Sequence, residues 1–298
     1  MLEINEVCQS FRTGFWMKNA EVLDRITFTV PKRSIFGFLG PNGAGKTTLI
    51  HLITGIKRPV SGTLKLNGVD THLAAAKRMI GYLPERPYFY DHLTGEALLT
   101  FFGRLTGMTE SEIATRIPVV LEEVGMTHAR KLVLKKYSKG MLQRIGIAQA
   151  MIHNPEFLVL DEPMSGLDPV GRKEIRELIL RLAREGRTIF FSSHVIPDVE
   201  SICDSVAMIR KGKLIGCGSV AQFLARERNP VEVAFAGLSA EAARGCANFT
   251  EFREMSEGFR ATVGSDLDLE PALRKILDAK GKVLWVNPIR PSLEDAFS

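Results

Sequence analysis

The sequence has 298 residues, a formal net charge of +5 and a hydrophobic fraction of 45%. This length suggests one large domain, or one large and one small domain, with enough apolar residues for a full core. The positive charge is too small to indicate a class of partner by itself, although it would suit anionic ligands.

The cysteines and the apolar segments exclude several classes of protein. The four cysteines show no CxxC spacing and no nearby histidine pair, so we expect reduced thiols in a cytosolic protein rather than disulfides or a zinc site. The start, MLEINEVCQS, lacks the pattern of a signal peptide, and no stretch approaches the length of apolar residues that spans a bilayer. We therefore expect a soluble chain that would need another polypeptide for any membrane process.

Short apolar runs alternate with helical patterns as far as about residue 220. Continuous apolar runs are typical of strands that are buried on both faces of a mostly parallel sheet, so they predict an α/β domain. The runs are SIFGFLG (34–40), EFLVLDEP (156–163), RTIFFSSH (187–194) and SVAMIRKGKLIGCG (205–218).

The first of these runs leads into a glycine-rich loop that matches G-x-x-x-x-G-K-[ST] at every fixed position. Glycines let the backbone wrap closely, so that successive N–H groups point at phosphate oxygens, and the helix that follows adds the positive end of its dipole. An apolar strand before the loop and a helical pattern after it provide the required setting, so we predict nucleotide binding. The candidate binding residues are Gly40, Pro41, Asn42, Gly43, Ala44, Gly45, Lys46, Thr47 and Thr48.

Two residues of this loop have candidate roles in phosphate chemistry. Lys46 can reach the β- and γ-phosphates, and the hydroxyl of Thr47 can ligate Mg²⁺. Residues from about 86 to 150 follow as a mostly helical subdomain. Within it, EALLTFFGRLTG places Leu98, Leu99, Phe102 and Leu105 at helical spacing and predicts a packed helix that ends at Gly107.

Acidic residues and a histidine follow the next two apolar strands. In FLVLDEP, Asp161 and Glu162 stand at the end of a strand, which is the edge where an open parallel sheet binds ligands. Asp161 suits the Mg²⁺ site, and Glu162 suits a general base that polarises the attacking water. The strand that ends in Ser192-Ser193-His194 brings His194 to the same edge, where we interpret it as a γ-phosphate sensor that orients this water.

The most discriminating motif is YSKGMLQR (137–144), which opens a helical pattern. Ser138 has the residue type and place of an N-cap, so this helix can also present N–H donors to phosphate. The segment resembles the signature motif of ABC ATPases, most often written LSGGQ. With MSGLD (164–168) as the D-loop and His194 as the H-loop, the resemblance covers about residues 1–220.

The resemblance implies a P-loop NTPase fold: a RecA-like, mostly parallel sheet with an antiparallel N-terminal β part and the helical subdomain. It also implies that ATP and Mg²⁺ are bound, with Glu162, His194 and Lys46 as the catalytic residues. In this family, the signature of one subunit closes over the ATP that the P-loop of the other binds. The chain is therefore expected to form a head-to-tail dimer, with Ser138, Gly140 and Asp168 acting in trans.

Three positions depart from the family pattern or leave a choice open. Glu85 stands at the Q-loop, in GYLPE, where glutamine is usual; its oxygen can still serve Mg²⁺, although its charge is expected to alter metal or nucleotide preference. Lys139 and Met141 replace a commoner glycine and glutamine, as in drug, sodium and type-2 exporters. Phe11 is at the place of the aromatic residue that stacks on adenine, but Phe15 and Trp16 compete with it.

The pattern of predicted strands and helices changes after residue 220. SVAQFLARERNP (219–230) predicts a helix that ends at a linker, and residues 230–298 follow the order strand, helix, strand, strand, helix, strand of a small α+β, ferredoxin-like domain. This domain and the ending PSLEDAF (291–297) resemble the accessory domain of type-2 ABC exporter ATPases. The resemblance implies a cytoplasmic location on the inner face of the membrane, through an integral-membrane permease that contacts Glu85 and the cluster Tyr88-Phe89-Tyr90, unless that cluster is subdomain core.

Three alternatives are retained. An ABC importer subunit is the nearest, although its accessory domains are usually absent or differently patterned. A soluble ABC ATPase that acts on ribosomes or nucleic acid usually has two cassettes or long coiled coils, and neither occurs here, so no nucleic-acid partner is expected. A kinase or helicase with a P-loop would have neither the signature nor the H-loop. The cargo cannot be predicted, because in this architecture the permease selects it.

Overall fold

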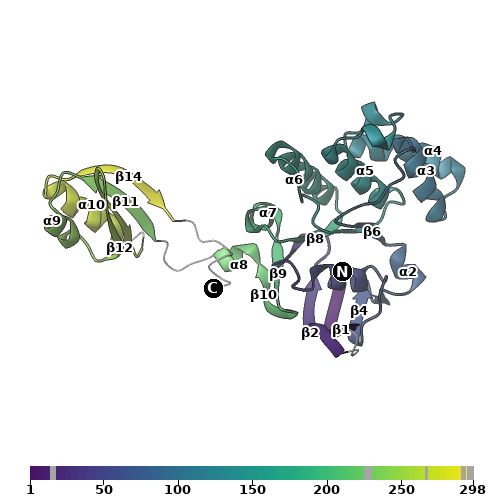
Figure 1. Cartoon of the computed structure of the whole chain (residues 1–298), viewed down its shortest axis with the longest axis horizontal. Helices are drawn as coiled ribbons and strands as arrows, with labels where there is room; N and C mark the ends of the chain where they lie inside the picture. The colour runs from purple at the N-terminus through teal and green to yellow at the C-terminus, as the bar shows by residue number, and fades with distance from the viewer. Residues whose placement is uncertain (14–17, 225–229, 266–267, 290–292, 294–298) are drawn as a thin grey trace. The chain divides into compact units, whose positions relative to one another are not determined.

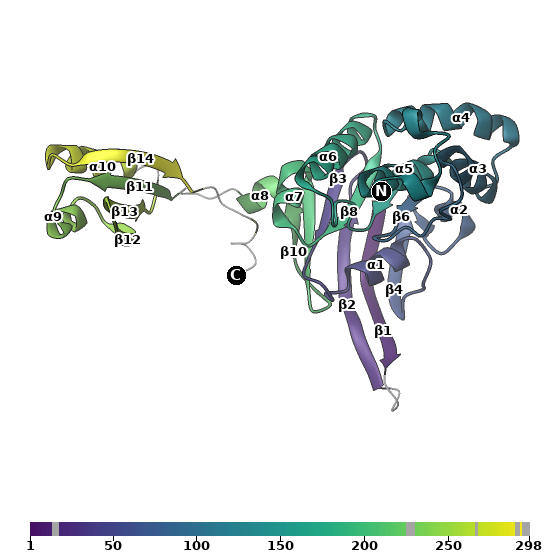
Figure 2. The same ribbon diagram turned by 45° about the horizontal axis from the view of Figure 1, so that its top comes forward.

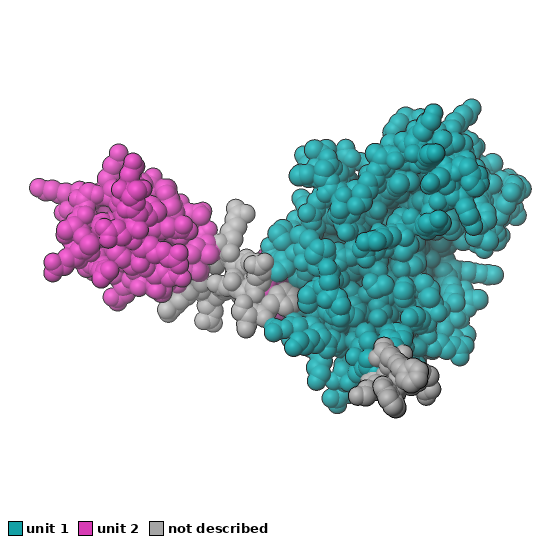
Figure 3. Space-filling model, viewed as in Figure 1, with its two compact units in different colours: residues 1–220 teal, residues 221–298 magenta. Residues whose placement is uncertain are grey.

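The computed structural model describes residues 1–13, 18–224, 230–265, 268–289 and 293. The chain divides into two compact units, Met1–Val220 and Ala221–Ser298 (Figure 3). Each unit has its own apolar core. Among the described residues, no helix has both the length and the apolar character that a membrane crossing requires.

The centre of the first unit is a six-stranded sheet whose strands lie in the order β10-β9-β3-β8-β7-β6 (Figure 1). Five neighbouring strands, from β9 to β6, are parallel, and β3, β7 and β8 are buried along their whole length. The continuous apolar runs therefore predicted these strands correctly. Their bounds are Ile35–Leu39 (β3), Ile80–Leu83 (β6), Phe157–Leu160 (β7), Thr188–Ser193 (β8), Ser205–Arg210 (β9) and Lys213–Ser219 (β10).

The run 205–218 differs from its interpretation as a strand of the buried sheet. It forms an antiparallel hairpin, in which β10 is the edge strand and is only partly covered. Lys211 and Gly212 turn the chain between the two strands with φ of 50° and 78°. The polar sequence RKGK was the signal for this turn, because a glycine tolerates the left-handed conformation that a tight hairpin needs.

A second, antiparallel sheet lies against the first, as the N-terminal part of the family fold predicts. Its order is β2-β1-β4-β5, and the core between the sheets contains an aromatic stack in which Phe36 lies 5.3 Å from Phe28 and 5.8 Å from Phe190, ring to ring. Helix α1 shares this core (Figure 2). The bounds are Leu2–Thr13 (β1), Lys18–Val30 (β2), Ser61–Leu66 (β4), Val69–Asp70 (β5) and Lys46–Ile53 (α1).

The opposite face of the parallel sheet is covered by helices, α7 among them. Gly37 of β3 lies so close to α7 that a β-carbon there would come 2.8 Å from the side chains of Val199 and Cys203. Helix α6 begins at the N-cap Asp168, which accepts a hydrogen bond from the N–H of Gly171 at 3.0 Å. The bounds are Ala74–Lys77 (α2), Pro169–Arg184 (α6) and Ile196–Ile202 (α7).

The helical subdomain forms where it was predicted (Figure 1). In α3, Leu98 and Leu99 are buried, but Leu105 is 65% exposed, so its assignment to the packed stripe was wrong. The reason is that α3 ends at this residue, whereas α4 packs against the helix at Gly103 through Ile113. The bounds are Gly95–Leu105 (α3), Glu110–Glu123 (α4), Thr127–Ala129 and Leu134–Lys136 (two short 3₁₀ helices) and Lys139–Met151 (α5).

The second unit has the predicted ferredoxin-like topology. Its strands lie in the order β12-β13-β11-β14, all antiparallel, and the core residues of α9 and α10 pack on one face of the sheet. Of the predicted helix at 219–230, α8 is seen at Val220–Leu224, and residues 225–229 lie outside the described residues, as does the tail SLEDAF except Leu293. The other bounds are Val231–Ala236 (β11), Ala240–Gly245 (α9), Phe249–Met255 (β12), Gly258–Val263 (β13), Leu269–Asp278 (α10) and Lys282–Pro288 (β14).

Candidate functional site

The glycine-rich loop connects β3 to α1, which is the strand–loop–helix setting that the motif requires. Gly43 and Gly45 have φ of 78° and 109°, and a β-carbon at Gly45 would lie 2.8 Å from Cδ2 of Leu23. Only glycine fits this left-handed and crowded position. Gly45 is also the N-cap of α1 and provides no capping side chain, so the first N–H groups of the helix are left for a ligand.

The loop borders a pocket of about 340 Å³. Gly40, Pro41 and Ala44 do not line it, although they are part of the predicted binding loop. Ala44 is buried, and the carbonyl oxygens of Gly40 and Pro41 accept hydrogen bonds from Lys46 Nζ at 2.7 and 3.3 Å. The lining residues are Val22, Asn42, Gly43, Gly45, Lys46, Thr47, Thr48, Glu85 and Glu162.

Lys46 and Glu162 form an ion pair inside this pocket. Lys46 Nζ lies 3.2 Å from Glu162 Oε1, and both side chains are less than 10% exposed. In a buried ion pair, the attraction between the charges offsets the cost of desolvation only when the geometry is good. Removal of one partner leaves the other as an uncompensated buried charge. An anion that enters the pocket therefore competes with Glu162 and the two carbonyl groups for the lysine.

Asp161 is a buried carboxylate without a cationic side chain as partner among the described residues, and its side chain is 1% exposed. Burial raises the pKa of this carboxyl group, hydrogen bonds from Ser192 and Thr47 lower it, and the negative charges of Glu162 and Glu85 raise it again, with a net upward shift. The hydroxyl of Thr47 therefore meets Asp161, as the predicted metal site requires. A cation next to Asp161 would favour the charged carboxylate and so oppose the effect of burial on this pKa.

Ser192 joins the two acidic residues and was not among the predicted site residues. Its hydroxyl donates to Asp161 Oδ1 at 2.6 Å and accepts from the backbone N–H of Glu162 at 2.9 Å. This N–H is available because Glu162 has a left-handed φ of 48°, a conformation that a non-glycine residue adopts only when its surroundings hold it there. The only signal in the sequence was the place of Ser192 at the end of the adjacent apolar strand.

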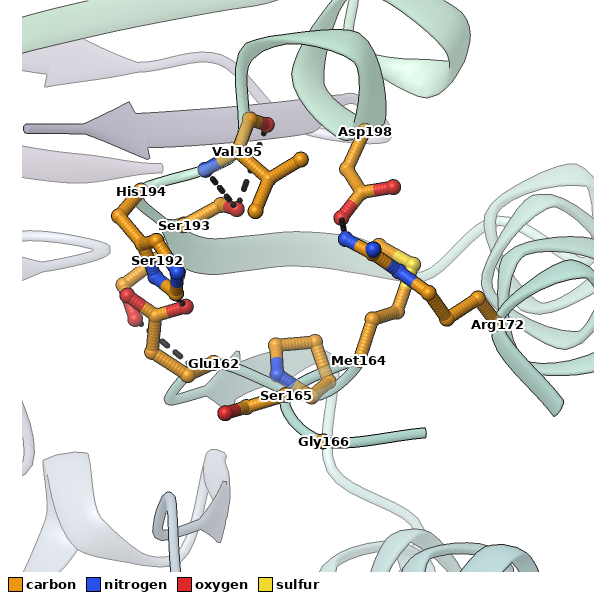
Figure 4. Close-up of a pocket in the computed structure, with 11 residues that line it drawn as sticks. Glu162, Met164, Ser165, Gly166, Arg172, Ser192, Ser193, His194, Val195 and Asp198 are labelled. Carbon is orange, nitrogen blue, oxygen red and sulfur yellow. Dashed lines mark hydrogen bonds and ion pairs between the residues drawn. The ribbon is translucent and has the colours of Figure 1, made fainter. Parts of the chain in front are cut away.

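His194 lies on the other side of Glu162. Its Nδ1 is 2.9 Å from Glu162 Oε2 (Figure 4). Glu162 therefore contacts His194 with one carboxylate oxygen and Lys46 with the other. The structure thus brings together the three predicted catalytic residues. Behind them is a second cavity of about 110 Å³, lined by residues 162–166, by Arg172 of α6, by the end of β8 and by the start of α7.

Glu85 also belongs to the nucleotide pocket. It lines the same pocket as Thr47 and Glu162, and its side chain is 45% exposed. Phe11, in contrast, does not line the pocket, and Lys57 Nζ lies 4.3 Å from the centre of its ring. Its competitors Phe15 and Trp16 lie outside the described residues. The aromatic residue that contacts the base stays a prediction.

The three residues that were predicted to act in trans lie outside both pockets. Ser138 is the N-cap of α5 and accepts from the N–H of Met141 at 3.2 Å, as the sequence predicted. A β-carbon at Gly140 would meet only Ser138 Oγ, at 4.0 Å, so the backbone there is open to another molecule. Asp168 is exposed, and its carboxylate caps α6 of its own chain.

The parallel sheet, the glycine-rich loop and the acidic residues at the carboxyl ends of the strands define a P-loop nucleoside triphosphatase. Residues 23–165 match the family described as ABC transporter. An ABC transporter ATP-binding protein of Synechocystis sp. is 41% identical over 302 residues, which cover 100% of this chain and 83% of the relative. The chain therefore belongs to the ATP-binding subunits of ABC transporters.

Two further comparisons agree with this assignment. The bacitracin transport ATP-binding protein BcrA of Bacillus licheniformis is 42% identical over 196 residues, which cover 65% of this chain and 63% of that protein. The solved structure of an ATP-binding subunit of an ABC transporter superposes with a TM-score of 0.64 at 29% identity, over 75% of this chain and 91% of that one.

Proposed function

We propose that this chain hydrolyses ATP as a head-to-tail dimer on the inner face of the membrane and thereby drives export through a separate permease. The observation that carries the hydrolytic part is the placement of Glu162. It is buried at the edge of the P-loop pocket, fixed by Ser192 through its backbone and contacted by Lys46 and His194. A carboxylate in this place can accept the proton of a water molecule that attacks the γ-phosphate.

The other residues of the pocket would bind either the phosphates or the metal ion. Lys46 would exchange its ion pair with Glu162 for the β- and γ-phosphates, which frees the carboxylate to act as a base. Thr47, Asp161 and Glu85 offer hydroxyl and carboxylate oxygens, which suit Mg²⁺, and burial raises the pKa of Asp161, so a cation beside this carboxylate would stabilise its charged form. A bound Mg²⁺ would neutralise charge on the phosphates.

The separation of the two phosphate-binding elements supports the proposed dimer. The P-loop pocket contains no residue of the signature segment, whereas the exposed helix terminus at Ser138 is open at Gly140. One chain can therefore supply a P-loop to one ATP and a signature to another. The helix terminus adds N–H donors and the positive end of a dipole to the partner's nucleotide.

The permease contact is supported by an exposed aromatic surface next to Glu85. Tyr88 and Tyr90 are 95% and 57% exposed, and they line a pocket of about 260 Å³ with Phe89 and Leu142. Phe89 packs edge-on against Phe102 of α3 and Tyr90 packs edge-on against Phe101, so Tyr88 is the most exposed ring of the three. Tyrosine is enriched among residues that anchor protein interfaces, which favours a partner here over a purely internal role. Export rests on the similarity of the relatives and of the accessory domain.

Tyr88→Ala should separate permease binding from ATP hydrolysis. We expect the ATPase activity of the isolated chain to stay within about twofold, because a fully exposed side chain contributes little to folding. Binding to the membrane-embedded permease should weaken by at least about tenfold, as expected for the loss of a tyrosine anchor. Pull-down with the permease in detergent would measure this, with Leu105→Ala as the control at another exposed apolar residue of the subdomain. Equal binding by wild type and Tyr88→Ala would contradict the assignment.

A further inference from the structure

The cavity behind Glu162 shares one lining residue with the nucleotide pocket. Glu162 lines both spaces and is the one residue that they share. Its Oε1 faces Lys46 in the nucleotide pocket, and its Oε2 faces His194 at the wall of the rear cavity. The Glu162 carboxylate therefore stands between the lysine that would hold the γ-phosphate and the histidine of the rear cavity.

The far wall of the cavity is formed by Arg172 and Asp198, which carry opposite charges. Asp198 is almost completely buried, and its two carboxylate oxygens contact Arg172 at 2.6 Å and Arg176 at 3.3 Å (Figure 4 shows the first pair). The cluster of these two guanidinium groups and one carboxylate has a formal net charge of +1. Arg172 lines the cavity and Arg176 does not, whereas the Nε atoms of both are buried donors without a hydrogen-bond partner among the described residues.

We propose that this rear cavity receives the inorganic phosphate product and that Arg172 is the group that draws it there, an inference that rests on the proposed ATP hydrolysis. The Nε of Arg172 is available as a donor, and a guanidinium group suits a tetrahedral oxyanion better than a lysine would. At about 110 Å³, the cavity has room for several water molecules or for one small anion. The direct exit past the P-loop is closed in a sandwich dimer, so a rear exit would let phosphate leave before the dimer opens.

The charge of the separating residue favours this movement at the right moment. Before cleavage, the Glu162 carboxylate would repel an anion. After it has taken the proton of the attacking water, Glu162 is neutral and no longer opposes the passage of phosphate. Its contact with His194 is then the remaining barrier, and His194 is 42% exposed, so it has room to move.

The test compares Arg172→Gln with Arg176→Gln in the full-length chain under saturating Mg-ATP. The two arginines lie one helical turn apart on α6, contact the same carboxylate and are 32% and 33% exposed. ATP cleavage would be followed by rapid quench, and phosphate release by a fluorescent phosphate-binding protein. Arg172→Gln should leave cleavage unchanged and slow release by at least about tenfold, because charge-assisted hydrogen bonds are the stronger class. Arg176→Gln should change neither rate.

Further measurements distinguish a phosphate-binding role of Arg172 from a structural role. Added inorganic phosphate should inhibit wild type and Arg176→Gln more strongly than Arg172→Gln, and Arg172→Lys should recover part of the release rate because it keeps the charge. Equal slowing in both glutamine variants would show a purely structural role of the Asp198 cluster and would overturn the proposal. Release as fast as in wild type would also overturn it. A wild-type chain that does not cleave ATP would instead refute the proposed function.

Discussion

Glu162→Gln should lower ATP turnover by about 10²–10⁴-fold, the usual contribution of a general base, and should hold the chain as an ATP-bound dimer. The amide keeps the shape of the carboxylate but cannot accept the proton of the attacking water. The substitution also removes the buried ion pair with Lys46, which lies 3.2 Å away and keeps its bonds to the carbonyl oxygens of Gly40 and Pro41. The lysine is thus still satisfied and becomes more available to phosphate.

Steady-state ATPase assays and size-exclusion chromatography with Mg-ATP would measure the two effects. Glu156→Gln is a matched control, since Glu156 is an exposed carboxylate beside the opposite end of the same strand, β7. This control should turn over ATP as wild type does and should elute as wild type with ADP. A Glu162→Gln variant with normal turnover would refute the role of Glu162, and one that stays monomeric with ATP would refute the head-to-tail dimer.

Much of the site could be predicted because its signals are local. The P-loop needs glycines at fixed places and an apolar strand before them, and these are visible in one segment of sequence. The order of strands and helices in the second unit could also be predicted, because strand and helix patterns alternate cleanly there. Asp161 and His194 were placed at one sheet edge by the general rule for parallel strands.

Other features depend on contacts between distant segments and have no local signal. The hydrogen bonds of Ser192 to Asp161 and to the backbone of Glu162 exist because β7 and β8 are neighbours, and the left-handed φ of Glu162 follows from the same packing. The pair between Arg172 and Asp198 joins two helices in the same way. Leu105 was misplaced because its exposure depends on where α4 crosses α3.

Asp161→Asn should raise the thermal stability of the free chain at neutral pH and lower that of the nucleotide-bound chain, each relative to wild type. In the free chain, the folded state raises the pKa of Asp161, chiefly by burial, so the folded state binds this proton more tightly than the unfolded state does. Stability therefore falls as the pH rises from the unfolded pKa through the folded pKa, and the loss persists at neutral pH. Asparagine carries no charge, its oxygen can still accept from Ser192, and its NH₂ group can donate to the hydroxyl of Thr47. We expect a higher melting temperature than wild type at neutral pH and a smaller difference in acid.

With Mg-ATP bound, we expect wild type to melt at a higher temperature than Asp161→Asn. The folded wild-type chain gains about 2.7 kcal/mol of stability at a hundredfold excess of ligand over its Kd, because the ligand binds only the folded state. The Asp161 carboxylate contributes to this binding because it would lie beside the cation. Asp161→Asn lacks that charge and should gain much less, and its ATPase activity should fall to background. Thermal melts at neutral and acidic pH, each with and without Mg-ATP, would separate these effects. A free Asp161→Asn chain that melts below wild type at neutral pH would show that Asp161 serves the fold; a higher melting temperature together with lost activity would show that its buried charge is kept for the metal.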